Sequence, residues 1–74
     1  MVRKLTHADV SRTKETFVSV YQSVGGWKAV VLGWDAELDT FVPEQTGFSG
    51  FVEKEDAVRD AESWARSEGL PLVI

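Results

Sequence analysis

The 74-residue chain contains no cysteine, one histidine, one methionine and two prolines. Without thiols it can form neither a disulfide nor a thiolate metal site, so side-chain packing has to supply its stability. It also lacks any run of 18 or more apolar residues, the length that a membrane-spanning helix requires. A chain this short buries only about 60% of its unfolded surface and forms a single core. We therefore expect one small, soluble, cytoplasmic domain.

Groups that could carry catalysis are scarce as well. His7 is the only histidine, and no thiol or second base accompanies it, whereas general-base and metal roles need an oriented partner. Asp35, Glu37 and Asp39 alternate like the first ligands of a calcium loop, but threonines stand where such a loop requires glycine and glutamate. We predict no enzyme activity, no cofactor and no metal site.

Charge is unevenly distributed along the chain. The net charge is −4, but residues 1–14 hold four cations against one carboxylate, and the remainder holds four cations against eleven carboxylates. The N-terminal segment is thus +3 and the rest −7, and an acidic body repels the phosphate backbone of nucleic acids. Contact with a nucleic acid would have to use the N-terminal cations, which are Arg3, Lys4, Arg12 and Lys14.

Three segments have the composition of β-strands. Residues 16–24 and 27–34 are rich in β-branched and aromatic side chains, and a third strand over residues 38–42 is expected to end before Pro43. The first two segments are joined at Gly25-Gly26 and are expected to form a tight hairpin. A two-residue loop would pair residue 24 with residue 27. Both faces of this hairpin carry apolar side chains, so the helix should cover one face and the N-terminal arm or a partner the other.

The helix is the most clearly marked element and covers residues 54–68. Its apolar side chains recur at helical spacing on one face: Ala57, Val58, Ala61, Trp64 and Ala65. Gly69 marks its end, and the apolar residues 70–74 should add an edge strand or pack on the sheet. The predicted class is α+β, a three-stranded antiparallel sheet packed on one helix in the order β-β-β-α, with an optional fourth short C-terminal strand.

Residues 1–14 show no sustained apolar periodicity. They are predicted to form a flexible basic arm in front of a single domain that covers residues 15–74.

Two kinds of side chain suggest a surface for a protein partner. Trp27 begins and Trp34 ends the same predicted strand, on opposite faces, so one of them is a candidate exposed aromatic anchor. Carboxylates supply the other part, and although a solvated face is the ordinary explanation for them, a negative surface for a basic protein is the alternative. The candidate partner-binding residues are Trp27, Trp34, Asp35, Glu37, Asp39, Glu44, Asp56 and Asp60.

The succession of a hairpin through GGW, a third strand, a turn near TGFSGF and a helix reading KEDAVRDAESWARSEGLP resembles small uncharacterised bacterial and phage domains with a three-stranded sheet and one helix. Related sheets serve some phage integrases as DNA-binding modules, and small acidic phage proteins include inhibitors of host nucleic-acid enzymes. The resemblance implies a phage or mobile-element accessory protein.

These observations leave three hypotheses of function open. The first is a non-enzymatic protein-interaction module that binds a larger basic host protein through an acidic surface. The second is a nucleic-acid binder that uses the N-terminal cations with aromatic side chains of the sheet. The third is a homodimer that pairs an exposed sheet edge.

Overall fold

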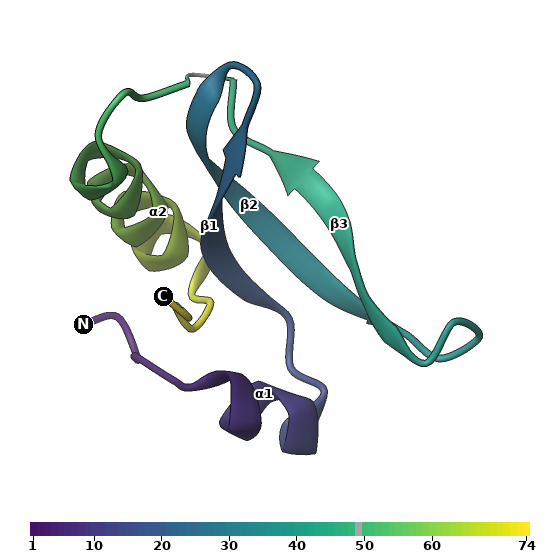
Figure 1. Cartoon of the computed structure of the whole chain (residues 1–74). Helices are drawn as coiled ribbons and strands as arrows, with labels where there is room; N and C mark the ends of the chain where they lie inside the picture. The colour runs from purple at the N-terminus through teal and green to yellow at the C-terminus, as the bar shows by residue number, and fades with distance from the viewer. Residues whose placement is uncertain (49) are drawn as a thin grey trace.

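The computed structural model describes residues 1–48 and 50–74, which form a three-stranded antiparallel sheet and two helices (Figure 1). In chain order the elements are α1 (His7–Thr13), β1 (Phe17–Ser23), β2 (Gly26–Asp35), β3 (Thr40–Thr46) and α2 (Lys54–Glu68). The strands lie side by side in the order β1-β2-β3, and α2 packs on one face of the sheet. The predicted α+β class is confirmed, with α1 as an additional helix.

The β1–β2 hairpin differs from the predicted register. Gln22 lies opposite Trp27, and the two turn residues are Val24 and Gly25. The predicted pairing of residues 24 and 27 is therefore wrong. The glycine that the turn requires is Gly26, which begins β2. Its φ is 108°, a backbone conformation that residues with a Cβ atom rarely adopt. The observed pairing is shifted by two residues from the predicted pairing. Side chains alternate between the two faces of a strand, so each side chain keeps its predicted face.

The turn end of this hairpin is fixed to the segment that leads into α2. Trp27 and Phe51 exchange two backbone hydrogen bonds, with N···O distances of 2.7 and 2.8 Å. A Cβ on Gly26 would lie 2.7 Å from the Phe51 carbonyl oxygen, so only glycine permits this approach. The hairpin turn and the start of α2 are consequently held at the same end of the molecule (Figure 1).

The third strand, predicted over residues 38–42, begins at Thr40 and continues through Pro43 to Thr46, so both predicted ends are wrong. Proline is tolerated there because β3 is an edge strand and need not donate on its outer side. The pairing with β2 shifts between Val31 and Leu32, which leaves Glu44 as an extra bulge residue. The turn predicted near TGFSGF begins only after this longer strand, and its residue Ser49 lies outside the described residues.

Small side chains bring α2 close to the sheet. Ala57, Ala61 and Ala65 are buried on the inner face of the helix, whose predicted bounds are confirmed, and Gly69 ends it with a φ of 68°. The core between helix and sheet consists of Val18, Ala29, Val31, Ala61, Ala65 and Leu72. Among the described residues no helix has the length and apolarity needed to cross a membrane.

The C-terminal segment was predicted either to add an edge strand or to pack on the sheet. It pairs with the sheet through its backbone, which is the first of these alternatives. Residues 71–73 lie between β1 and residues 3–5, parallel to both. Leu72 exchanges backbone hydrogen bonds of 2.8 and 2.9 Å with residues 3–5, and Val18 exchanges two of 2.9 Å with residues 71–73. The predicted fourth strand is therefore present as a short bridge, which also holds the N-terminal segment in place.

A helix, α1, occupies much of the segment predicted to be an arm without regular structure. Thr6 and Asp9 form a reciprocal capping box at its start. Val10 is 1% exposed and forms a second apolar cluster with Phe17 and Val73, on the sheet face opposite α2. One buried valine in a seven-residue helix gives no periodic signal, so tertiary packing rather than local pattern stabilises this element.

Candidate functional site

The structure divides the six predicted partner-binding carboxylates into two groups. One group lies on the β2–β3 hairpin and comprises Asp35, Glu37, Asp39 and Glu44; the other, Asp56 and Asp60, lies on α2. β2 has ten residues, about 30 Å of strand, and α2 begins near its first residue whereas the hairpin loop follows its last (Figure 1). The two groups therefore belong to separate surfaces.

We call residues 35–44 the acidic hairpin. The Oδ1 atom of Asp35 accepts hydrogen bonds from the backbone N–H groups of Glu37 and Leu38, at 2.9 and 3.2 Å, and so shapes the loop. Glu37 and Asp39 extend into solvent on either side of Leu38, whose side chain is 65% exposed. An apolar side chain is thus presented between two carboxylates at the tip.

No cation balances this hairpin along the chain. From residue 29 to residue 53 the sequence contains five carboxylates and neither lysine nor arginine. Glu44 extends the negative charge along β3, and its carboxylate lies over Gly33 of the neighbouring strand, in the space that a larger residue would fill. The hairpin therefore carries carboxylates from its loop to the middle of β3, with the ammonium group of Lys14 as a neighbouring cation at Trp34.

The carboxylates on α2 have other surroundings. Asp56 forms an ion pair with Arg59, three residues along the helix. Asp60 lines a groove of about 580 Å³ together with Phe48 and Trp64. These two residues are therefore partly neutralised or recessed, and they do not extend the acidic hairpin.

Both candidate tryptophans are half-buried, and neither is the freely exposed anchor that the sequence suggested. Trp34 packs against Phe41 with ring centroids 5.1 Å apart, and the ammonium group of Lys14 lies over its ring. Trp27 lies on the α2 face, where the ammonium group of Lys54 is 5.4 Å from its ring centroid.

Most of the predicted nucleic-acid-binding cations have partners within the chain. Arg3 pairs with Glu15 at 2.7 Å, Arg12 with Asp9 at 3.8 Å, and Lys14 with the ring of Trp34. The ion pairs of Arg3 and Arg12 are solvent-exposed and contribute little to stability, but they lower the charge available to a phosphate backbone, whereas the contact with the neutral Trp34 ring leaves the charge of Lys14 unchanged. The N-terminal segment is therefore less basic at its surface than its composition suggests.

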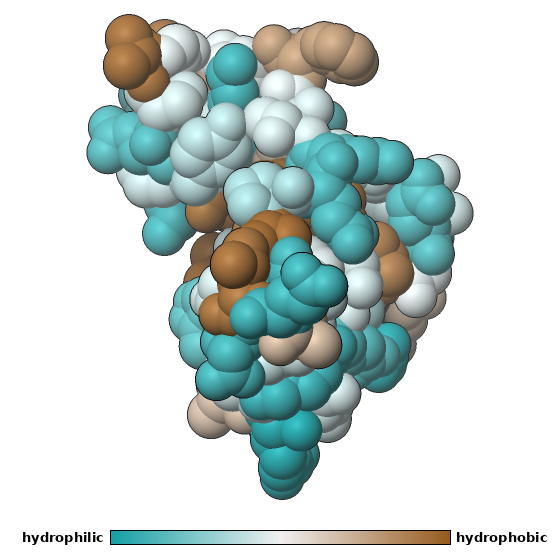
Figure 2. Space-filling model, turned by 90° about the vertical axis from the view of Figure 1, so that its right-hand side faces the viewer, coloured by the Kyte–Doolittle hydropathy of each residue, from teal (hydrophilic) through white to brown (hydrophobic). Residues whose placement is uncertain are grey.

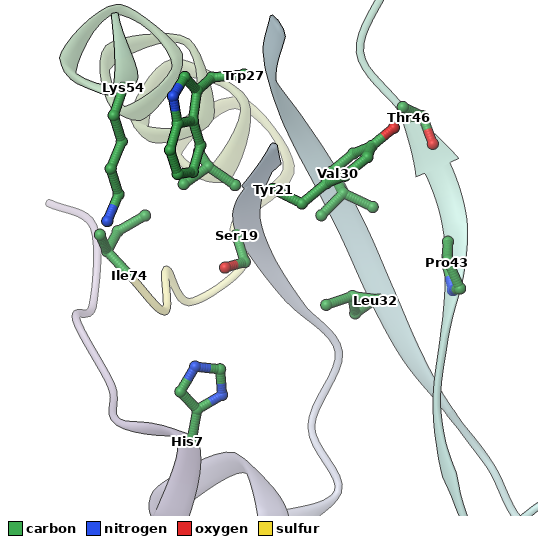
Figure 3. A pocket seen from close by; sticks show the side chains of 11 residues that line it. His7, Ser19, Tyr21, Trp27, Val30, Leu32, Pro43, Thr46, Lys54 and Ile74 are labelled. Carbon is green, nitrogen blue, oxygen red and sulfur yellow. The ribbon is translucent and has the colours of Figure 1, made fainter. Parts of the chain in front are cut away.

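A groove of about 540 Å³ lies on the sheet face opposite α2 and reaches around the outer edge of β1 (Figure 3). Tyr21, Val30 and Thr46 line it on the sheet face, and His7 faces it from α1. Beyond the edge of β1 it is bounded by Trp27, Lys54 and Ile74. The sequence signalled this site only indirectly, through the apolar content of both hairpin faces.

A further apolar surface lies at the turn end of the sheet. Val24, Phe48 and Val52 are almost completely exposed there. Figure 2, which views the molecule from the side of β3, shows apolar side chains projecting at this end and mostly hydrophilic residues over the lower part. None of the three was predicted as a site residue, because isolated apolar residues in turns are common in sequences.

Within residues 1–48 and 50–74, no group of three or more His, Cys, Asp or Glu side chains is placed to hold a metal ion. No protein-family model, no curated protein and no solved structure matches the chain significantly.

Proposed function

We propose that the chain is a non-enzymatic protein-interaction module whose acidic hairpin binds a basic surface of a larger protein. The observation that carries the proposal is the absence of any lysine or arginine between residues 29 and 53, a stretch with five carboxylates, four of which lie on the acidic hairpin. Unneutralised carboxylates on one surface attract and orient a basic partner.

The tip of the hairpin supports this proposal in a second way. Leu38 is exposed between Glu37 and Asp39 and offers an apolar contact to a partner that also meets these carboxylates. A partner with an apolar depression ringed by lysine or arginine fits this arrangement. Burial of the leucine adds affinity, while the carboxylates contribute specificity and the rate of association.

Nucleic-acid binding and homodimerisation are less well supported. Two of the four N-terminal cations, Arg3 and Arg12, already form ion pairs within the chain, and the net charge of −4 opposes approach to a phosphate backbone. A homodimer that paired the β3 edges would bring two acidic hairpins together, and Pro43 and the bulge at Glu44 oppose such pairing. The biological setting that the sequence resemblance suggests, a phage or mobile-element accessory protein, stays a prediction.

The test is a pull-down with the immobilised chain and a host-cell lysate at about 50 mM and about 500 mM salt, where screening is weak and strong respectively. The hairpin variant Glu37→Gln/Asp39→Asn/Glu44→Gln removes three charges from the acidic hairpin. The matched control Glu55→Gln/Glu62→Gln/Glu68→Gln removes three charges from α2, so both variants have the same net charge.

We expect a partner that is retained at low salt, released at high salt, retained by the α2 control and lost by the hairpin variant. Equal loss with both variants would show that only net charge matters, which contradicts a specific hairpin surface. Recovery of no protein at either salt concentration would also contradict the proposal.

A further inference from the structure

The outer edge of β1 is covered over only half of its length. At its start, Val18 exchanges two backbone hydrogen bonds with residues 71–73. Further along, Val20 and Gln22 receive no backbone hydrogen bond from outside the β1–β2 hairpin within the described part of the chain. Because outward-facing residues alternate along a strand, Val20 and Gln22 point their N–H and C=O groups the same way as Val18.

These open backbone groups adjoin a site that a strand could fill. The 540 Å³ groove extends to both faces beside this part of β1, with Ser19 and Tyr21 on one face and Val20 and Trp27 on the other. An added strand would continue the line of residues 71–73 and point alternate side chains into the two halves of the groove. Figure 3 shows the lining side chains on both sides of the β1 ribbon.

The opposite edge of the sheet is not suited to the same use. β3 contains Pro43, which cannot donate a backbone hydrogen bond, and the adjacent Glu44 forms a bulge. Proline and bulges are the features by which edge strands resist pairing. β1 has neither feature between Val20 and Ser23, so it is the edge that remains available.

The charge of the groove indicates what kind of strand it accepts. Its lining includes the ammonium group of Lys54 and the imidazole of His7, both of which can donate to an anion, and no carboxylate side chain. This contrasts with the acidic surface on the rest of the sheet. An occupant with a carboxylate among apolar side chains is complementary to these walls.

We propose that the open half of β1 binds an extended segment of a partner protein, with alternating apolar side chains and a carboxylate that faces Lys54, by strand addition. This surface is distinct from the acidic hairpin. Backbone hydrogen bonds to Val20 and Gln22 supply the alignment, and the two halves of the groove select the side chains.

The probe is a seven-residue peptide, acetylated and amidated, that alternates valine and threonine around a central aspartate. A second peptide has lysine in place of the aspartate. Amide exchange measured by NMR on the full chain should slow by about tenfold at Val20 and Gln22 when the aspartate peptide is added, as expected for amides that become hydrogen-bonded. The lysine peptide should bind about fivefold more weakly.

Variants at Gln22 test the geometry, and a variant at Lys54 tests the charge. Gln22→Pro removes the outward N–H while leaving the pairing with β2 available, and it should weaken binding at least about tenfold, whereas Gln22→Ala retains the N–H and should bind like the parent. Lys54→Glu should reverse the preference between the two peptides, and it tests the proposal without changing β1. The hairpin variant with Glu37→Gln/Asp39→Asn/Glu44→Gln should bind the aspartate peptide unchanged.

Several results would overturn the inference. Unchanged exchange at Val20 and Gln22 with millimolar aspartate peptide would show that the edge does not accept a strand. Slow exchange that depends on protein concentration alone would show that a second copy of the chain occupies the edge. Binding that Lys54→Glu leaves unaltered would contradict the assigned charge of the occupant.

Discussion

The ammonium group of Lys14 lies 4.1 Å from the centroid of the Trp34 ring. This contact connects Lys14, the C-cap residue of α1, to the far end of β2, and it covers part of the Trp34 ring. Lys14 makes it from a left-handed backbone conformation, with a φ of 60°. A favourable side-chain contact and an unfavourable backbone conformation therefore occur at one residue.

Replacing Lys14 separates these two effects. Lys14→Ala removes the cation and keeps a Cβ at positive φ, so the free energy of unfolding should fall by about 0.5–1 kcal/mol. Lys14→Gly also removes the cation but relieves the backbone, so it should be more stable than the alanine variant by about 1 kcal/mol. Urea unfolding followed by tryptophan fluorescence measures both. Equal stability of the two variants would show that the left-handed conformation costs nothing there.

Acid should weaken α1 through Asp9. The backbone N–H of Thr6 donates to the Asp9 carboxylate, and with the Thr6 hydroxyl it lowers the pKa of that carboxyl below its ordinary value of 3.8. A lowered folded-state pKa stabilises the fold above the unfolded-state pKa, and this contribution is lost as the pH falls through the lowered value. An NMR titration from pH 7 to pH 2 should show the Thr6 amide shifting with Asp9. In Asp9→Asn that transition should be absent.

Gly26 should be irreplaceable where Gly25 is not. At Gly26 a Cβ would meet the Phe51 carbonyl oxygen at 2.7 Å and would also sit at a φ of 108°. Gly26→Ala should therefore lower the free energy of unfolding by about 1–3 kcal/mol and release the segment before α2. At Gly25 the nearest atom is the flexible end of Lys28 at 3.8 Å, so Gly25→Ala is the matched control and should be tolerated. Thermal unfolding by circular dichroism compares the two, and similar melting temperatures would argue against the close approach.

Leu72 should be among the most sensitive core positions. Its side chain is 1% exposed and packs with Val18 and the inner face of α2. Leu72→Ala should lower the free energy of unfolding by about 2–5 kcal/mol, which is comparable to the whole stability expected of so small a domain. Leu38→Ala removes the same atoms from a side chain that is 65% exposed and should leave stability unchanged. Denaturant titrations that gave similar losses for both variants would contradict the assignment of the core.

Local signals determined how well each element could be predicted from the sequence. The bounds of α2 were predicted correctly because apolar spacing, acidic first-turn residues and Gly69 all agree within one segment. The hairpin register was missed because the demand for glycine at position 26 comes from Phe51, which is distant in the sequence. The end of β3 was missed because the edge position overrides the usual effect of Pro43.

The candidate sites also differ in how far they could be predicted, because some depend on neighbouring residues and others on contacts between distant segments. The acidic hairpin could be predicted in part, since Asp35, Glu37 and Asp39 are neighbours in the sequence. They are separated from Asp56 and Asp60 by the length of β2, because α2 begins near the other end of that strand. The sequence pattern did not predict where α2 lies relative to β2. The groove beside β1 arises from the packing of α1, α2 and residues 71–74 around one strand, and no single segment encodes it.

The parallel pairing of residues 3–5 with residues 71–73 has a consequence for folding. Leu72 hydrogen-bonds to residues 3–5 and packs against β1, so these contacts join segments that lie far apart in the sequence. The β1–β2 hairpin joins strands that are adjacent in the sequence and does not depend on this pairing. Because contacts between distant parts of a chain are slow to form, the pairing of residues 71–73 with residues 3–5 should be completed late in folding.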